Sequence, residues 1–122
     1  MIPWLGRLAR SFGCAFAGLV CLMQTQRNAR IHLLAFALVI AAGAWLGISA
    51  AEWCIVTLAC GMVIAAEALN TAIEKLADRV TTAKDEQIRM AKDVAAAGVL
   101  VTAGAALIVG LIIFLPRLAG KL

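Results

Sequence analysis

The chain has 122 residues, of which 64% are apolar and only 15% are charged, and its mean hydropathy is +0.98. Soluble domains are roughly 45–50% apolar and about a quarter charged, so this composition predicts an integral membrane protein. The length is that of one domain, residues 1–122, and excludes separate catalytic and regulatory domains. The net charge of +4 comes from basic residues that flank apolar runs. Such residues act as topology signals, and we expect no nucleic-acid partner.

Residues 4–24 are expected to form an amphipathic helix on the membrane surface. Arg7, Arg10 and Cys14 fall on the side opposite to the apolar residues. The sequence leaves open whether this helix only anchors the protein or also covers a cytoplasmic site. The apolar side recurs at spacings of three or four residues, at Leu5, Leu8, Phe12, Phe16, Leu19 and Met23.

Three apolar runs long enough to cross a bilayer follow. Residues 31–51 and 94–115 carry no charge over 21 and 22 residues. The run at 53–66 covers 14 residues and continues at helical period with acids interposed. The predicted fold class is therefore all-α, with a surface helix and three transmembrane helices. These spans are expected at about residues 30–48, 50–79 and 91–115.

The ends of the spans carry their own signals. Ser49, followed three residues later by Glu52, predicts a capping box after a tight hairpin. Pro116 is expected to close the third span. Nine of the eleven basic residues precede the first span or lie between the second and third. Basic short loops stay cytoplasmic, so we expect the N-terminus in the cytoplasm and the C-terminus outside.

A polar stripe marks the second span, at Glu67, Asn70, Glu74 and Asp78. At 100° per residue these positions fall within an arc of about 80°, and they rise roughly 16 Å along the helix. Acids inside a membrane are costly and need partners or a task. One alternative is a packing or assembly seam, in which the acids pair with Lys or Arg of a neighbour.

The chemistry of these groups favours phosphoryl transfer at an interface. Carboxylates suit a hard cation such as Mg²⁺, which fills its shell with substrate phosphates. Lys92 could hold phosphate oxygens, and a deeper carboxylate could act as general base for a lipid hydroxyl. Neither G-x-x-x-x-G-K-[ST] nor G-x-G-x-x-G is present, so another architecture must hold any nucleotide.

Two segments carry a resemblance more specific than this chemistry. Glu67-Ala-Leu-Asn-Thr-Ala-Ile-Glu74, followed by Asp78 and by Ala91-Lys92-Asp93, resembles the signature of the small prokaryotic diacylglycerol kinase and undecaprenol kinase family. The segment Gln26-Arg-Asn-Ala-Arg-Ile-His32 is similar to its undecaprenol kinase-like branch. The likeness extends over essentially the whole chain.

The resemblance implies a homotrimeric kinase of the bacterial cytoplasmic (inner) membrane, with sites shared between subunits. Such an enzyme moves the γ-phosphate of ATP, with Mg²⁺ as cofactor, onto a lipid hydroxyl. Glu67 then matches the catalytic base, with Asn70 beside it, and Glu74 with Gln26 matches the metal site. The lipid is expected at Glu67, Arg30 and Ala96. Nucleotide contacts are expected at Arg7, Cys14, Gln26, Glu74, Asp78, Lys92 and Asp93.

The sequence leaves alternatives open for the lipid substrate and for the class of function. The context of Arg30 and His32 favours undecaprenol over diacylglycerol. A small proton-coupled transporter or channel subunit would use Glu67 as an intramembrane proton site and would need no nucleotide. A catalytically weak relative is a third reading. His32 itself is expected to form only an interfacial hydrogen bond rather than to carry protons or bind a ligand.

The sequence departs from the family pattern at two places. Gln26 stands where the family usually has a metal-binding Glu, and a neutral amide oxygen is a weaker Mg²⁺ ligand. Ala83-Lys84-Asp85 stands where the family often has Glu-Tyr-His, so the nucleotide preference is not carried over.

We predict that Gln26→Glu restores a second carboxylate and lowers the Mg²⁺ concentration needed for half-maximal turnover. The measurement is a Mg²⁺ titration of initial rate in both proteins. An unchanged Mg²⁺ dependence would mean that position 26 does not touch the ion.

Overall fold

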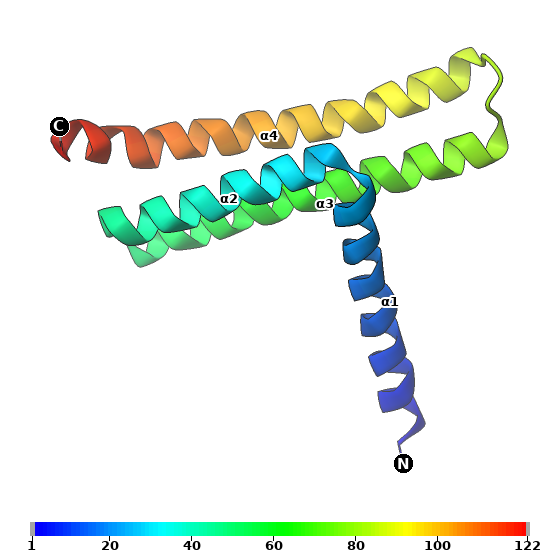
Figure 1. Ribbon diagram of the computed structural model, residues 1–122, viewed down its shortest axis with the longest axis horizontal. Helices are drawn as coiled ribbons and strands as arrows, with labels where there is room; N and C mark the ends of the chain where they lie inside the picture. Colours follow the sequence, from blue (N-terminus) through cyan, green and yellow to red (C-terminus); the bar gives the residue numbers. More distant parts are fainter. Residues whose placement is uncertain (1, 122) are drawn as a thin grey trace.

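The computed structural model describes residues 2–121, and this range contains only α-helices, which confirms the all-α prediction. The four helices are α1 (Pro3–Thr25), α2 (Arg27–Leu46), α3 (Ala50–Val80) and α4 (Glu86–Lys121). Helices α2, α3 and α4 run alongside one another, whereas α1 leaves this bundle transversely and carries the N-terminus away from it (Figure 1).

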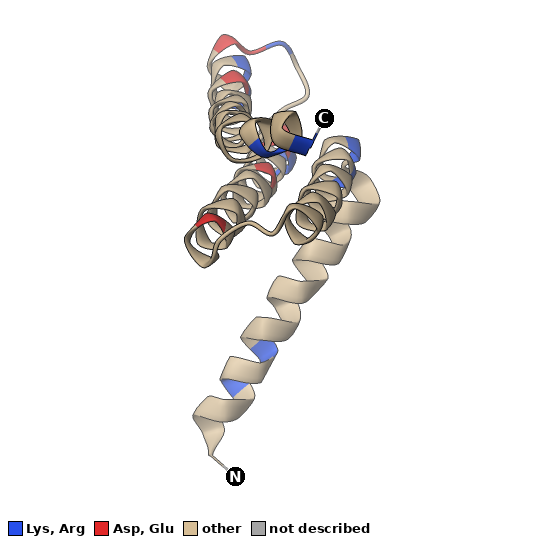
Figure 2. Cartoon of the chain, turned by 90° about the vertical axis from the view of Figure 1, so that its left-hand side faces the viewer, with Lys and Arg blue, Asp and Glu red and all other residues tan. Residues whose placement is uncertain are grey.

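All four helices are long and apolar enough to cross a membrane by length and composition. Long stretches of α2, α3 and α4 carry no charge (Figure 2). Most of their large apolar side chains are exposed in the single chain; Leu100, for example, is 74% exposed. Such surface requires lipid or protein around it, so the chain is an integral membrane protein.

The elbow between α1 and α2 is built from backbone and arginine contacts. Gln26 adopts an extended conformation and interrupts the helix, while its N–H still donates to the carbonyl of Leu22 at 2.9 Å. Nη1 of Arg30 donates to the carbonyls of Met23 and Gln24 at 3.0 and 3.1 Å. A cation on the last carbonyls of a helix also suits its dipole. Arg30 therefore fixes the direction in which α1 leaves the bundle.

The hairpin between α2 and α3 has the predicted capping box. Gly47 lies in the left-handed region at φ 67° and ends α2, a conformation that favours glycine. Ser49 Oγ accepts from the Glu52 N–H, and the Glu52 carboxylate accepts from the Ser49 N–H. Close by, a small core of Ile48, Val56 and Ile113 joins α3 to α4.

Helix α4 does not end at Pro116 as the sequence suggested, but continues to Lys121. Proline cannot donate to the carbonyl of Ile112 one turn earlier, but the side chain of the next residue holds the turn to its neighbours. Nη1 of Arg117 donates to the carbonyl of Ile113 at 3.0 Å. The same guanidinium binds Glu52 through two contacts of 2.6 Å. This bidentate pair ties the last turns of α4 to the start of α3.

Gly43 supplies a test of the packing between α2 and α3. A Cβ at this position would lie 2.8 Å from the Trp53 ring and 3.1 Å from Ile48. We expect Gly43→Ala to destabilise the protein by about 1–3 kcal/mol through overpacking and to lower the Tm in detergent. Gly61→Ala is the control, because nothing lies within 4 Å of that Cβ. Equal Tm values for the two variants would contradict this packing.

Candidate functional site

The predicted polar stripe lies along α3, but its four members make different contacts in the single chain. Glu67 meets α2, Asn70 and Glu74 meet each other, and Asp78 meets α4. These contacts follow one another from the middle of α3 toward its C-terminal end. One chain therefore brings the stripe together as three successive levels rather than as one cluster.

Glu67 forms the deepest level. It is only 3% exposed, and its Oε1 lies 3.3 Å from Nε2 of His32 on α2. Within residues 2–121, Oε1 has no partner that meets hydrogen-bond geometry. Val63, one turn earlier on α3, is completely buried. The carboxylate is thus held away from solvent with an incompletely satisfied oxygen, a costly arrangement unless a further group binds it.

Two further polar atoms beside Glu67 are also unsatisfied. In the described part of the chain, Oδ1 of Asn70 and Oγ1 of Thr71 are buried and have no hydrogen-bond partner. Nδ2 of Asn70 donates to Oε1 of Glu74 at 3.5 Å. Because buried polar atoms in folded proteins are nearly always paired, three such atoms within two turns indicate that something else binds here. The sequence reasoning missed Thr71, although it stands inside the quoted signature.

The third level joins α3 to α4. Nζ of Lys92 lies 2.5 Å from Oδ1 of Asp78, and both side chains are accessible, at 36% and 56% exposure. They line a cavity of about 830 Å³ together with the α3–α4 connection. The cavity holds acidic, basic and hydroxyl groups, so it suits a polar ligand. Its other lining residues are Thr81, Thr82, Ala83, Lys84, Asp85, Glu86, Ile88 and Arg89.

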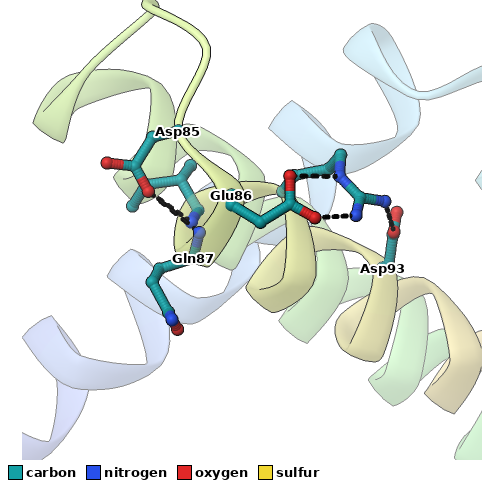
Figure 3. A network of polar contacts seen from close by, with 6 residues as sticks. Asp85, Glu86, Gln87 and Asp93 are labelled. Carbon is teal, nitrogen blue, oxygen red and sulfur yellow. Dashed lines mark hydrogen bonds and ion pairs between the residues drawn. The ribbon is translucent and has the colours of Figure 1, made fainter.

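The start of α4 has a separate polar network (Figure 3). Oδ1 of Asp85 accepts from the N–H groups of Gln87 and Ile88 at 2.9 and 3.1 Å, as an N-cap does. Arg89 binds Glu86 and, at 3.1 Å, Oδ2 of Asp93. Lys92 and Asp93, which the resemblance gives a shared role, therefore take different partners in the single chain.

The remaining predicted site residues are scattered. Arg7 and Cys14 are exposed on the part of α1 that points away from the bundle (Figure 1). Gln26 is half-buried at the elbow, Arg30 binds carbonyls of α1, and Ala96 is exposed on α4. The contacts described above bring none of these five residues to Glu67.

A second cavity lies on the apolar side of Glu67. It measures about 460 Å³ and is lined by residues of α2 and α4 with Val63 of α3. His32 is the only ionisable residue in its lining. Because His32 also contacts Glu67, the carboxylate is adjacent to an apolar space, while the polar cavity lies eleven residues further along α3 at Asp78.

Known proteins are similar to this chain over most of its length. The sequence model of the family described as prokaryotic diacylglycerol kinase matches residues 13–114. An undecaprenol kinase of Bacillus subtilis is 39% identical over 114 residues, which are 93% of each chain. A diacylglycerol kinase of Synechocystis sp. is 40% identical over 109 residues, which are 88% of this chain and 62% of that protein.

The predicted resemblance is thereby confirmed. The family description and the names of both relatives share one enzyme class, that of lipid kinases. The chain belongs to the prokaryotic diacylglycerol kinase family.

Proposed function

We propose that this protein transfers the γ-phosphate of ATP to the hydroxyl group of a membrane lipid at the cytoplasmic interface. The observation that carries the proposal is the position of Glu67. Its buried carboxylate contacts His32, which lines the apolar cavity. It also lies on the same helix face as Asp78, which lines the polar cavity. A lipid alcohol from the apolar side and ATP from the aqueous side can react only where the two environments meet.

Glu67 acts as the general base in the proposed reaction. Its carboxylate accepts the hydroxyl proton while the lipid oxygen forms a bond to the γ-phosphorus. The bond from that phosphorus to the β–γ bridging oxygen breaks, and ADP leaves with the electron pair. Such transfers depend mainly on positioning and on stabilising phosphate charge. Lys92 supplies a cation for phosphate oxygens once it releases Asp78, and that exposed pair is weak.

The oxygen-rich region around Asn70 and Glu74 fits Mg²⁺. No group of three His, Cys, Asp or Glu side chains is assembled within residues 2–121. Mg²⁺, however, needs only one or two protein carboxylates when substrate phosphates complete its shell. Glu74 and the unpartnered Oδ1 of Asn70 are the donors here, with Gln26 as a further proposed ligand. When bound, the ion neutralises phosphate charge.

The complete site is proposed to form in a homotrimer. Arg7 and Cys14 lie on the part of α1 that points away from their own bundle, so a neighbouring subunit would receive them. The unsatisfied atoms of Glu67, Asn70 and Thr71 and the exposed apolar faces support contacts from outside the chain. The proposed nucleotide contacts are then Arg7 and Cys14 of one subunit with the stripe of another. Gln26, Lys92 and Asp93 are the remaining proposed nucleotide contacts.

The proposed membrane topology follows the basic residues. The N-terminus and the α3–α4 connection face the cytoplasm of a bacterium, the C-terminus lies outside, and α1 rests on the cytoplasmic surface of the inner membrane. Helix α1 contacts α3, and His32 in the second turn of α2 approaches Glu67. In the proposed topology Glu67 lies near the interface and Asp78 lies beyond it in water.

Undecaprenol is the proposed acceptor, with diacylglycerol as the alternative, and Arg30 and Ala96 are proposed to lie along its path. The alignment with this chain covers 93% of the undecaprenol kinase of Bacillus subtilis. It covers only 62% of the diacylglycerol kinase of Synechocystis sp.. This difference in coverage favours the prenyl alcohol.

The function is tested with purified protein, labelled ATP and either undecaprenol or diacylglycerol, with and without Mg²⁺. We expect label in the organic phase, and we expect Glu67→Gln to lower kcat by about 10²- to 10⁴-fold, the usual contribution of general base catalysis. Glu52→Gln, at the far end of α3, is the control and should retain kcat. A folded wild-type protein that labels neither lipid would refute the proposal.

Lys92 offers a second test. Its hydrogen bond to a phosphate would be worth about 1.5–3 kcal/mol, so Lys92→Gln should raise the KM for ATP roughly 10- to 100-fold. The KM for lipid should stay within about twofold, because Lys92 lines only the polar cavity. Steady-state kinetics with each substrate varied in turn measure both, and Lys75→Gln serves as the matched charge control. A selective rise in the lipid KM would contradict this role.

A further inference from the structure

His32 is the partner of the deepest acid. It is the single histidine of the chain and lies in the second turn of α2, directly after the elbow. Its Nε2 approaches Oε1 of Glu67 to 3.3 Å, with side-chain exposures of 25% and 4%. No other basic side chain within residues 2–121 is at ion-pair distance from Glu67.

The imidazole ring is held in place from its own helix. It stacks on Phe36, with ring centroids 6.0 Å apart and an interplanar angle of 20°. Both rings line the apolar cavity of about 460 Å³. The ring plane is therefore set by packing rather than by solvent, which is the arrangement expected of a group that orients another side chain.

We propose that His32 is a positioning residue, which holds the carboxylate of Glu67 for the reaction by donating a hydrogen bond from Nε2 to Oε1. The inference rests on the proposed function and deepens it. With Oε1 directed at His32, Oε2 is left to receive the proton of the lipid hydroxyl. At 3.3 Å the contact does not meet hydrogen-bond geometry in the single chain, and catalytic hydrogen bonds are often long or poorly aligned until substrate is bound.

The inference corrects the expectation that His32 forms only an interfacial hydrogen bond. A residue that merely anchors the start of a span would turn its ring to headgroups or water. Here the ring faces the least exposed carboxylate of the stripe. Removing the imidazole would leave that carboxylate without its one ionisable neighbour at ion-pair distance in the described chain, and an unpaired buried acid is costly.

The contact is tested first by ¹⁵N NMR of histidine-labelled protein prepared without a histidine tag, so that every imidazole signal comes from His32. Glu67→Gln should move the ring ¹⁵N resonances. Glu74→Gln, two turns further along α3, should leave them where they are. Wild-type resonances in Glu67→Gln would overturn the inference. This measurement needs no lipid, no nucleotide and no activity.

The role in catalysis is tested by kinetics at saturating ATP and lipid. His32→Leu, which has no donor, should lower kcat roughly 10- to 100-fold, as a small misplacement of a reacting group does. His32→Gln, which keeps an N–H donor, should recover kcat to within about threefold of wild type, and the KM for ATP should stay within about twofold in both. Equal losses in both variants, or a His32→Leu enzyme with wild-type kcat, would overturn the inference.

Folding is controlled by circular dichroism and size-exclusion elution. Should His32→Leu lose the wild-type profile, His32→Phe replaces it, because that ring keeps the stack on Phe36 but lacks a donor. A wild-type protein that phosphorylates no lipid would refute the proposed function alone. The NMR comparison would still decide whether His32 holds Glu67.

Discussion

A carboxylate buried on an apolar helix constrains much of this molecule. Glu67 is 3% exposed on a helix built to cross a membrane, and burying an ionisable group there is costly unless it has a partner. Helix α2 begins directly after the elbow at Gln26, and its second turn brings the chain's single histidine to the acid. The bend at Gln26 and the hold of Arg30 on the end of α1 thus position the contact that Glu67 requires.

The environment along α3 changes from apolar to polar in the direction of the stripe. An apolar cavity borders His32, buried unsatisfied oxygens follow at Asn70 and Thr71, and an exposed ion pair closes the series at Asp78. The order of these groups matches the order in which a lipid hydroxyl, the reacting phosphorus and the remaining phosphates would lie. In the proposed trimer these unsatisfied atoms would receive contacts from outside the chain.

Local rules predicted the helices and the capping box at Ser49 and Glu52, because each depends on residues within one or two turns of one another. The stripe was predictable for the same reason, since helical periodicity alone puts its members on one face. The partners across helices were not, because they depend on how α2 and α4 pack on α3. The approach of His32 to Glu67 was therefore not predicted, and neither was the N-cap of α4 at Asp85. The end of α4 was misjudged at Pro116, because the rule for proline takes no account of a following Arg117 that reaches both Ile113 and Glu52.

The two ends of the α3–α4 pair are fastened unequally. At the hairpin end, a bidentate guanidinium–carboxylate pair and a small apolar core tie the helices together. At the opposite end the chain itself joins them through residues 81–85, and a solvent-accessible lysine and aspartate form an ion pair worth about 0–1 kcal/mol. The Asp78–Lys92 contact can thus be lost at little cost in free energy. The two helices therefore keep their register when the Asp78–Lys92 contact is lost, because the covalent connection spans one end and the bidentate pair spans the other.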